Sequence, residues 1–113
     1  MGIITSKTVS VFAGDRIPLT RELFANDALI FKNIQAEKAT LHHQTKGEVL
    51  SITFSDFPDL GIWAKPNGDF VCIEPWLGYA DVTDSNQKLS EKEGIQTLGV
   101  GKTHHSSYEI TIA

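Results

Sequence analysis

Short alternating apolar segments dominate this chain, and no stretch keeps the 3.6-residue period of a long helix. The clearest alternation is EVLSITF at 48–54, where Leu50, Ile52 and Phe54 fall on one face of an extended chain and Ser51 and Thr53 on the other. This pattern predicts a strand with one buried and one solvated face. Similar patterns predict further strands over 7–12, 28–31, 39–43, 60–64, 70–74, 95–100 and 107–112.

Turn-forming residues separate these strands at short intervals. The polar segment Gln44–Gly47 ends in glycine and predicts a hairpin between its flanking strands, and Lys65–Gly68 predicts a tight turn that makes the strands on either side antiparallel neighbours. One helical turn is expected over Arg21–Phe24, with Thr20 as its N-terminal cap. Short strands joined by turns of this kind indicate an all-β protein, an antiparallel β-sandwich or barrel-like sheet.

The stretch Asp69–Asp81 (DFVCIEPWLGYAD) is the most informative for function. Its strand, 70–74, has apolar side chains on both faces and is therefore expected to be buried on both. Glu74 ends the strand, and Pro75, which has no amide hydrogen, is expected to end the ladder. Two interpretations of Glu74 remain open: a structural carboxylate paired with Lys or Arg, or a partly desolvated general base in a cleft with Trp76 as an apolar wall.

Length and charge narrow the class of protein. A chain of 113 residues with a net charge of −4 and no basic block is expected to form one domain that does not bind nucleic acid. No apolar stretch reaches the roughly 20 residues of a membrane span, and no secretion signal is evident, so we expect a cytoplasmic protein with no membrane partner. The lone cysteine, Cys72, agrees with a reducing compartment.

Histidine positions do not indicate a metal site. His42 and His43 are adjacent on a predicted strand and so point to opposite faces, and no His or Cys lies at metal-ligand spacing from them. The same holds for His104 and His105. We therefore expect no bound metal.

Four segments, in this order, carry a resemblance to a known family: LFANDALIF, GIWAKP, FVCIEPWLGYAD and EKEGIQTLGVGKTHHSSYEITI. Together they resemble the C-terminal part of aldose 1-epimerase (galactose mutarotase-like) proteins, from about Leu19 to the end of the chain. The resemblance implies a large antiparallel β-sandwich that binds a hexose in a cleft on one sheet and needs no cofactor. It also implies acid/base ring opening, in which a glutamate takes the anomeric proton and a histidine protonates the ring oxygen.

The resemblance assigns the base to Glu74. It suggests Asp27 as a ligand of sugar hydroxyls, although a capping role at a strand entrance explains that residue equally well. Trp63 and Trp76 are candidates for contact with the sugar ring face, with core packing as the alternative. Weaker candidates for substrate binding are Lys65 and Asp81, for which a turn lysine and a turn aspartate are the simpler interpretations.

The family's acid histidine belongs to a portion that would precede residue 1, and none of the four histidines matches its motif. We therefore expect residues 1–113 to be one domain, the C-terminal part of such a sandwich, and inactive alone. Its open sheet edge would favour a homodimer or pairing with an N-terminal part. Two other functions stay open: a non-catalytic carbohydrate-binding β-sandwich and an interaction domain in which Glu74 is structural.

Overall fold

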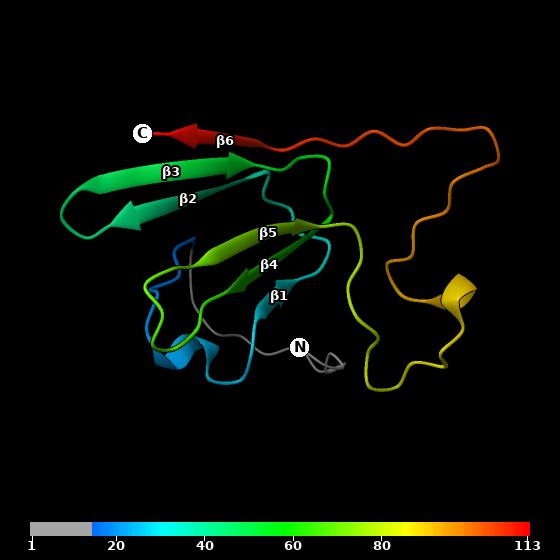
Figure 1. The fold of residues 1–113 in the computed structure, drawn as a ribbon, viewed down its shortest axis with the longest axis horizontal. Helices are drawn as coiled ribbons and strands as arrows, with labels where there is room; N and C mark the ends of the chain where they lie inside the picture. Colours follow the sequence, from blue (N-terminus) through cyan, green and yellow to red (C-terminus); the bar gives the residue numbers. More distant parts are fainter. Residues whose placement is uncertain (1–14) are drawn as a thin grey trace.

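The computed structural model describes residues 15–113, so the strand predicted at 7–12 lies outside the described residues. Two three-stranded antiparallel sheets make up the fold (Figure 1). One sheet has the order β1 (Leu29–Phe31), β4 (Asp59–Trp63), β5 (Cys72–Trp76); the other has the order β2 (Lys38–His43), β3 (Gly47–Thr53), β6 (Glu109–Ile112). Two 3-10 turns, η1 (Glu22–Phe24) and η2 (Leu89–Glu91), are the other elements of residues 15–113. The predicted all-β antiparallel sandwich is confirmed.

The two predicted tight connections are both present. The β2–β3 hairpin closes with His43 opposite Gly47, whose φ of +77° lies in the region that favours glycine. At the other turn the Gly68 amide donates to the Lys65 carbonyl at 2.9 Å, and β4 and β5 leave it as antiparallel neighbours with Trp63 opposite Cys72. Local turn chemistry thus determines the order in which these strands pair.

The core lies between the two sheets. Ile52 and Phe54, from the apolar face of the 48–54 segment, pack with Leu60 of β4, and these three side chains are 6%, 0% and 3% exposed. Half-buried apolar side chains of both sheets surround them. The alternation at 48–54 therefore marks the face of β3 that joins the two layers. The opposite face is only partly solvated, contrary to the prediction, because Thr53 is exposed but Ser51 is 6% exposed.

The predicted helical turn is confirmed as η1, but its predicted cap is wrong. The N-cap residue is Arg21, which makes no side-chain capping hydrogen bond, and the Thr20 carbonyl accepts a hydrogen bond from the Leu23 amide at 3.3 Å. The turn carries Phe24, which is 5% exposed. A single 3-10 turn of this kind is held by burial of one aromatic side chain rather than by a cap.

The strand predicted at 95–100 is not formed. Gly94, with φ of +80°, turns the chain into an extended arm beyond the sheets (Figure 1), and Ile95, Leu98 and Val100 are 40%, 57% and 103% exposed. No described strand lies beside this arm to supply hydrogen bonds. An apolar alternation without a partner backbone does not make a ladder.

Strand β5 also corrects two expectations. It begins at Cys72 rather than Phe70, and all five of its residues are half-buried, so the strand is not buried on both faces. It continues through Pro75, which pairs in register with Leu60, to Trp76. Proline is accepted here because β5 is an edge strand among the described residues, where one side of the strand has no ladder to supply.

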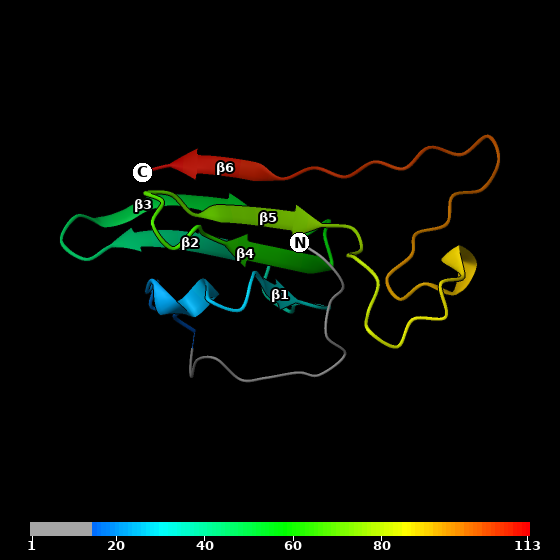
Figure 2. The same cartoon turned by 60° about the horizontal axis from the view of Figure 1, so that its bottom comes forward.

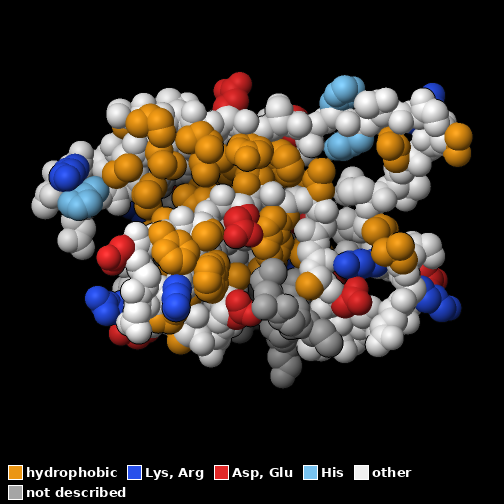
Figure 3. Space-filling model, viewed as in Figure 1, with side chains coloured by type: hydrophobic (Ala, Val, Ile, Leu, Met, Phe, Trp, Pro, Cys, Tyr) orange, Lys and Arg blue, Asp and Glu red, His pale blue; other side chains and the backbone are white. Residues whose placement is uncertain are grey.

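Strand β6 extends the β2–β3–β6 sheet beyond the area that the other sheet covers (Figure 2). In Figure 2, β4 and β5 overlie β2 and β3, whereas β6 lies beyond them. Tyr108, Ile110 and Ile112, which share one side of the last segment, are 55%, 55% and 72% exposed, and hydrophobic side chains gather over this region in Figure 3. Ile110 and Ile112 pair with Ile52 and Leu50, so they continue the core-facing side of the sheet.

Candidate functional site

The outer face of the β1–β4–β5 sheet carries the candidate site. Leu60, Ile62 and Ile73 point inward to the core, and because side chains alternate along a strand, their neighbours point outward. The register sets three pairs side by side on this outer face: Asp59 with Trp76, Gly61 with Glu74, and Trp63 with Cys72. Glu74 therefore lies at the centre of β5, opposite a residue without a side chain.

Glu74 is held by a neighbour on its own strand. The indole Nε1–H of Trp76 donates to Glu74 Oε2 at 2.9 Å, and both residues are half-buried. Residues two apart on a strand share a face, which is why this contact can form. Across from Glu74, a Cβ placed on Gly61 would lie 2.6 Å from Cζ2 and 2.8 Å from Cε2 of Trp76. The indole ring thus occupies the space above Gly61.

Trp63 lies on the same face, diagonal to Glu74 in the register. Diagonal positions in an antiparallel pair are about 7–8 Å apart, within the reach of an indole ring. The ring contacts Phe70 edge to face, with centroids 5.9 Å apart and planes at 61°. The structure therefore brings three predicted site residues, Trp63, Glu74 and Trp76, onto one surface.

Asp59 is a residue of this face that the sequence interpretation missed. Its carboxylate is 3% exposed and accepts two hydrogen bonds, from the Asn33 amide at 3.1 Å and the Gly78 amide at 3.2 Å. These bonds join the end of β1, the start of β4 and the segment after β5. An aspartate after a proline at a strand entrance was a visible signal, but its partners are 26 and 19 residues away.

A second cluster that the sequence interpretation missed lies just after Trp76 and consists of Tyr79, Lys32 and Glu93. Tyr79 is hydrogen-bonded to Glu93; burial, that hydrogen bond and the nearby charges of Glu93 and Asp59 raise its pKa to about 12. Lys32 Nζ lies 4.7 Å from the centroid of the Tyr79 ring and 3.5 Å from Glu93 Oε2. Because Glu93 contacts both Tyr79 and Lys32, these interactions hold the 91–94 loop against the end of the sheet. With this pKa, the Tyr79 phenol is neutral at physiological pH.

The remaining three predicted site residues lie apart from one another. Asp27 is exposed, has φ of +83°, and its Oδ1 accepts a hydrogen bond from the following amide, of Ala28, at 2.8 Å; this geometry matches the capping interpretation. Lys65 lines a shallow hollow of about 150 Å³ with Phe24 and Phe70.

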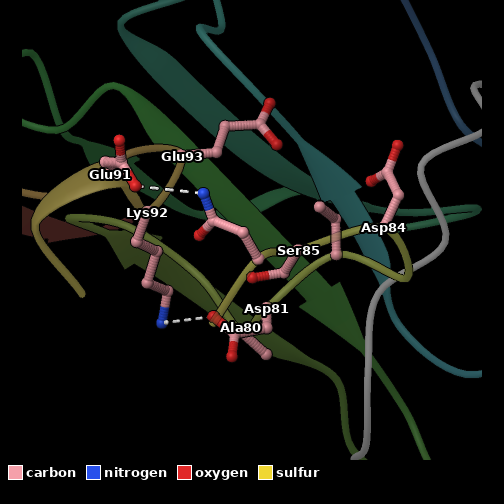
Figure 4. Close-up of a pocket in the computed structure, with 9 residues that line it drawn as sticks. Ala80, Asp81, Asp84, Ser85, Glu91, Lys92 and Glu93 are labelled. Carbon is pink, nitrogen blue, oxygen red and sulfur yellow. Dashed lines mark hydrogen bonds and ion pairs between the residues drawn. The ribbon is translucent and has the colours of Figure 1, made fainter. Parts of the chain in front are cut away.

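Asp81 lines a different hollow, of about 220 Å³, and is ion-paired with Lys92 at 3.6 Å (Figure 4). Asn86 and Glu91 close the same hollow through a 3.1 Å hydrogen bond. Neither of these two hollows is lined by Glu74 or Trp76. The structure therefore does not bring Lys65 and Asp81 together in one pocket.

Within residues 15–113, His, Cys, Asp and Glu side chains form no group of three or more that could hold a metal ion. The same part of the chain contains no helix of the length and apolar character needed to cross a membrane.

In sequence, the chain is similar to two curated LacX proteins. It is 30% identical over 97 residues to the plasmid-encoded protein LacX of Lactococcus lactis subsp. lactis, and equally to the chromosomal LacX of that organism. The match covers 85% of this chain but 32% of each LacX protein, so the chain spans about a third of the length of these curated relatives. No family model matches the chain, and no solved structure matches it significantly. The chain is thus similar to part of the LacX proteins.

Proposed function

We propose that this chain is the base-bearing part of an aldose 1-epimerase-like isomerase, which interconverts the α and β anomers of a hexose. Glu74 is the general base. The observation that carries the proposal is its setting: a half-buried carboxylate at the centre of a sheet face, with one oxygen bound by an indole N–H and a second tryptophan diagonal to it.

The reaction needs one base and one acid. Glu74 accepts the proton of the anomeric hydroxyl, the O–H electron pair becomes the second bond of a carbonyl, and the bond between C1 and the ring oxygen breaks. The ring oxygen keeps that electron pair and takes a proton from a Brønsted acid. Rotation about the C1–C2 bond and reclosure from the other face give the opposite anomer. A positioned carboxylate suits the first of these transfers.

Two further features support a sugar as the substrate. The aromatic plane of Trp63 suits the C–H groups on one face of a hexose ring. The second feature is that the motifs resembling aldose 1-epimerases, which act on hexoses, lie in a chain of which 85% matches the LacX proteins. The resemblance assigns the acid to a histidine that this sequence does not contain, so the chain alone is expected to be inactive.

The test supplies the missing acid from solution. Exchange between α- and β-D-galactose is followed by NMR magnetisation transfer at pH 7 with the full chain and increasing imidazole, whose cation can protonate the ring oxygen. We expect a rate above that of imidazole alone, saturating with sugar and reduced by at least about tenfold in Glu74→Gln, because loss of a positioned base typically costs that much or more.

Asp69→Asn is the matched control, because Asp69 is exposed and lies in the turn before β5. Its rate should equal that of the unmodified chain. Sugar binding with no added exchange at any imidazole concentration would contradict the isomerase proposal.

That outcome would favour a second candidate, a non-catalytic carbohydrate-binding β-sandwich. The observation in its favour is that the outer face holds a carboxylate and two tryptophans, a set sufficient to bind a sugar without transforming it. Titration with galactose, followed by tryptophan fluorescence, separates it from an interaction domain. A binding module responds and loses the response in Trp63→Ala; an interaction domain does not respond.

A further inference from the structure

Trp76 holds a different place from the one a sugar-stacking residue would need. Its N–H edge points at Glu74 Oε2, 2.9 Å away, and its six-membered ring lies against the β4 backbone at Gly61. A hydrogen bond from a fixed donor to a carboxylate is short and directional, so it restricts the rotation of the acceptor. The indole is thus placed to orient the Glu74 side chain.

Gly61 allows this orientation because it has no side chain where the Trp76 indole lies. It lies in the middle of β4, the central strand of its sheet, where glycine weakens a strand unless another group must approach closely. Here the approaching group is identified: Cζ2, Cε2 and Cη2 of Trp76 would lie 2.6, 2.8 and 3.1 Å from an added Cβ. Any larger residue at this position would push the indole off the strand.

The backbone that carries Trp76 is also clamped. Asp59, its register partner on β4, accepts the Gly78 amide at 3.2 Å and is itself buried. This bond holds the backbone two residues after Trp76. The Trp76 indole therefore contacts Gly61 and Glu74, and the Asp59–Gly78 bond holds the end of the strand that carries it.

We propose that Trp76, seated on Gly61, is the positioning residue for Glu74: it occupies Oε2 and leaves Oε1 as the atom that receives the anomeric proton. This inference rests on the proposed function for its chemical role. It removes Trp76 from the ring-face contacts of the sugar and leaves Trp63 as the aromatic platform. The positioning itself is a property of the protein that can be measured without any sugar.

The first experiment reads the hydrogen bond in the ¹⁵N-labelled full chain. The chain has two tryptophans, so two indole N–H signals are expected, and Trp63→Phe assigns them. Glu74→Gln and Gly61→Ala should each shift the Trp76 indole proton and increase its exchange with solvent, while the Trp63 signal stays in place. An unchanged Trp76 signal in Glu74→Gln overturns the proposal.

The second experiment separates positioning from sugar contact. Trp76→Phe keeps an aromatic ring but removes the N–H, so we expect galactose affinity within about twofold and an imidazole-assisted exchange rate lowered about tenfold, since misorientation costs rate rather than binding. A weakened affinity with an unchanged rate at saturation would overturn it and return Trp76 to the sugar surface. If no sugar binds at all, the proposed function fails, while the indole signals still decide whether Trp76 holds Glu74.

Discussion

The buried carboxylate of Asp59 accepts the Gly78 amide at 3.2 Å and so joins the start of β4 to the segment that leaves β5. Its other oxygen accepts the Asn33 amide at the end of β1. One side chain thereby connects all three strands of the sheet that carries Glu74. Hydrogen bonds to a charged, buried acceptor are among the stronger ones in proteins.

Replacing this carboxylate should destabilise the fold. Asp59→Ala leaves two amides without their acceptor, and we expect the free energy of unfolding to fall by about 2–4 kcal/mol. Urea denaturation followed by circular dichroism measures it. The exposed Asp69→Ala should change stability by less than about 0.5 kcal/mol; equal effects of the two substitutions would show that Asp59 has no special role.

Adding one methyl group at Gly61 should displace an indole ring. Because the new Cβ would lie 2.6 Å from Trp76 Cζ2, Gly61→Ala is expected to cost about 1–3 kcal/mol of stability. Tryptophan emission should shift as the ring moves. Gly99→Ala is the control, since its Cβ would meet only the flexible Lys102 side chain at 3.3 Å, and a similar loss there would argue against a steric cause.

Alkaline pH should loosen the end of the sheet through Tyr79. The pKa of this phenol is raised from 10.0 to about 12 in the fold, so its contribution to stability is fully present below pH 10 and is lost as the pH rises through 12. Ultraviolet titration of phenolate should show an ionisation step near pH 12 that is absent in Tyr79→Phe. This variant should also lose less stability between pH 10 and 12. Persistence of the step in Tyr79→Phe would exclude this assignment.

The exposed continuation of the core on β6 should promote self-association. Ile110 and Ile112 lie on an edge strand among the described residues and are mostly exposed, a combination that favours pairing with another chain. Sedimentation velocity should detect dimers or larger species that the double variant Ile110→Lys, Ile112→Lys reduces. Thr111→Lys, compared with Ile110→Lys alone, places one equal charge on the other side of β6 and should have less effect; a monomer at all concentrations would contradict this expectation.

Much of the architecture was predictable from short segments. The apolar side of Leu50, Ile52 and Phe54, the hairpin ending at Gly47 and the turn at Lys65–Gly68 depend on neighbours within a few residues, and each was found as predicted. The opposite side of β3 was not, because Ser51 is buried. Glu74 and Trp76 share one face only because β5 continues through Pro75, where the ladder was expected to end. What the sequence could not indicate was the contact between them.

Tertiary structure decided the features that need distant partners. The segment 95–100 has a strand-like pattern but no backbone beside it, and Asp59 acquires its role only when Asn33 and Gly78 approach. The seat of Trp76 on Gly61 likewise depends on the register of β4 and β5. By itself, then, the sequence determined which segments extend and which side of each is apolar, because side-chain alternation and turn chemistry act locally. Pairing, register and close approach were decided by the tertiary structure, because they depend on which strands meet.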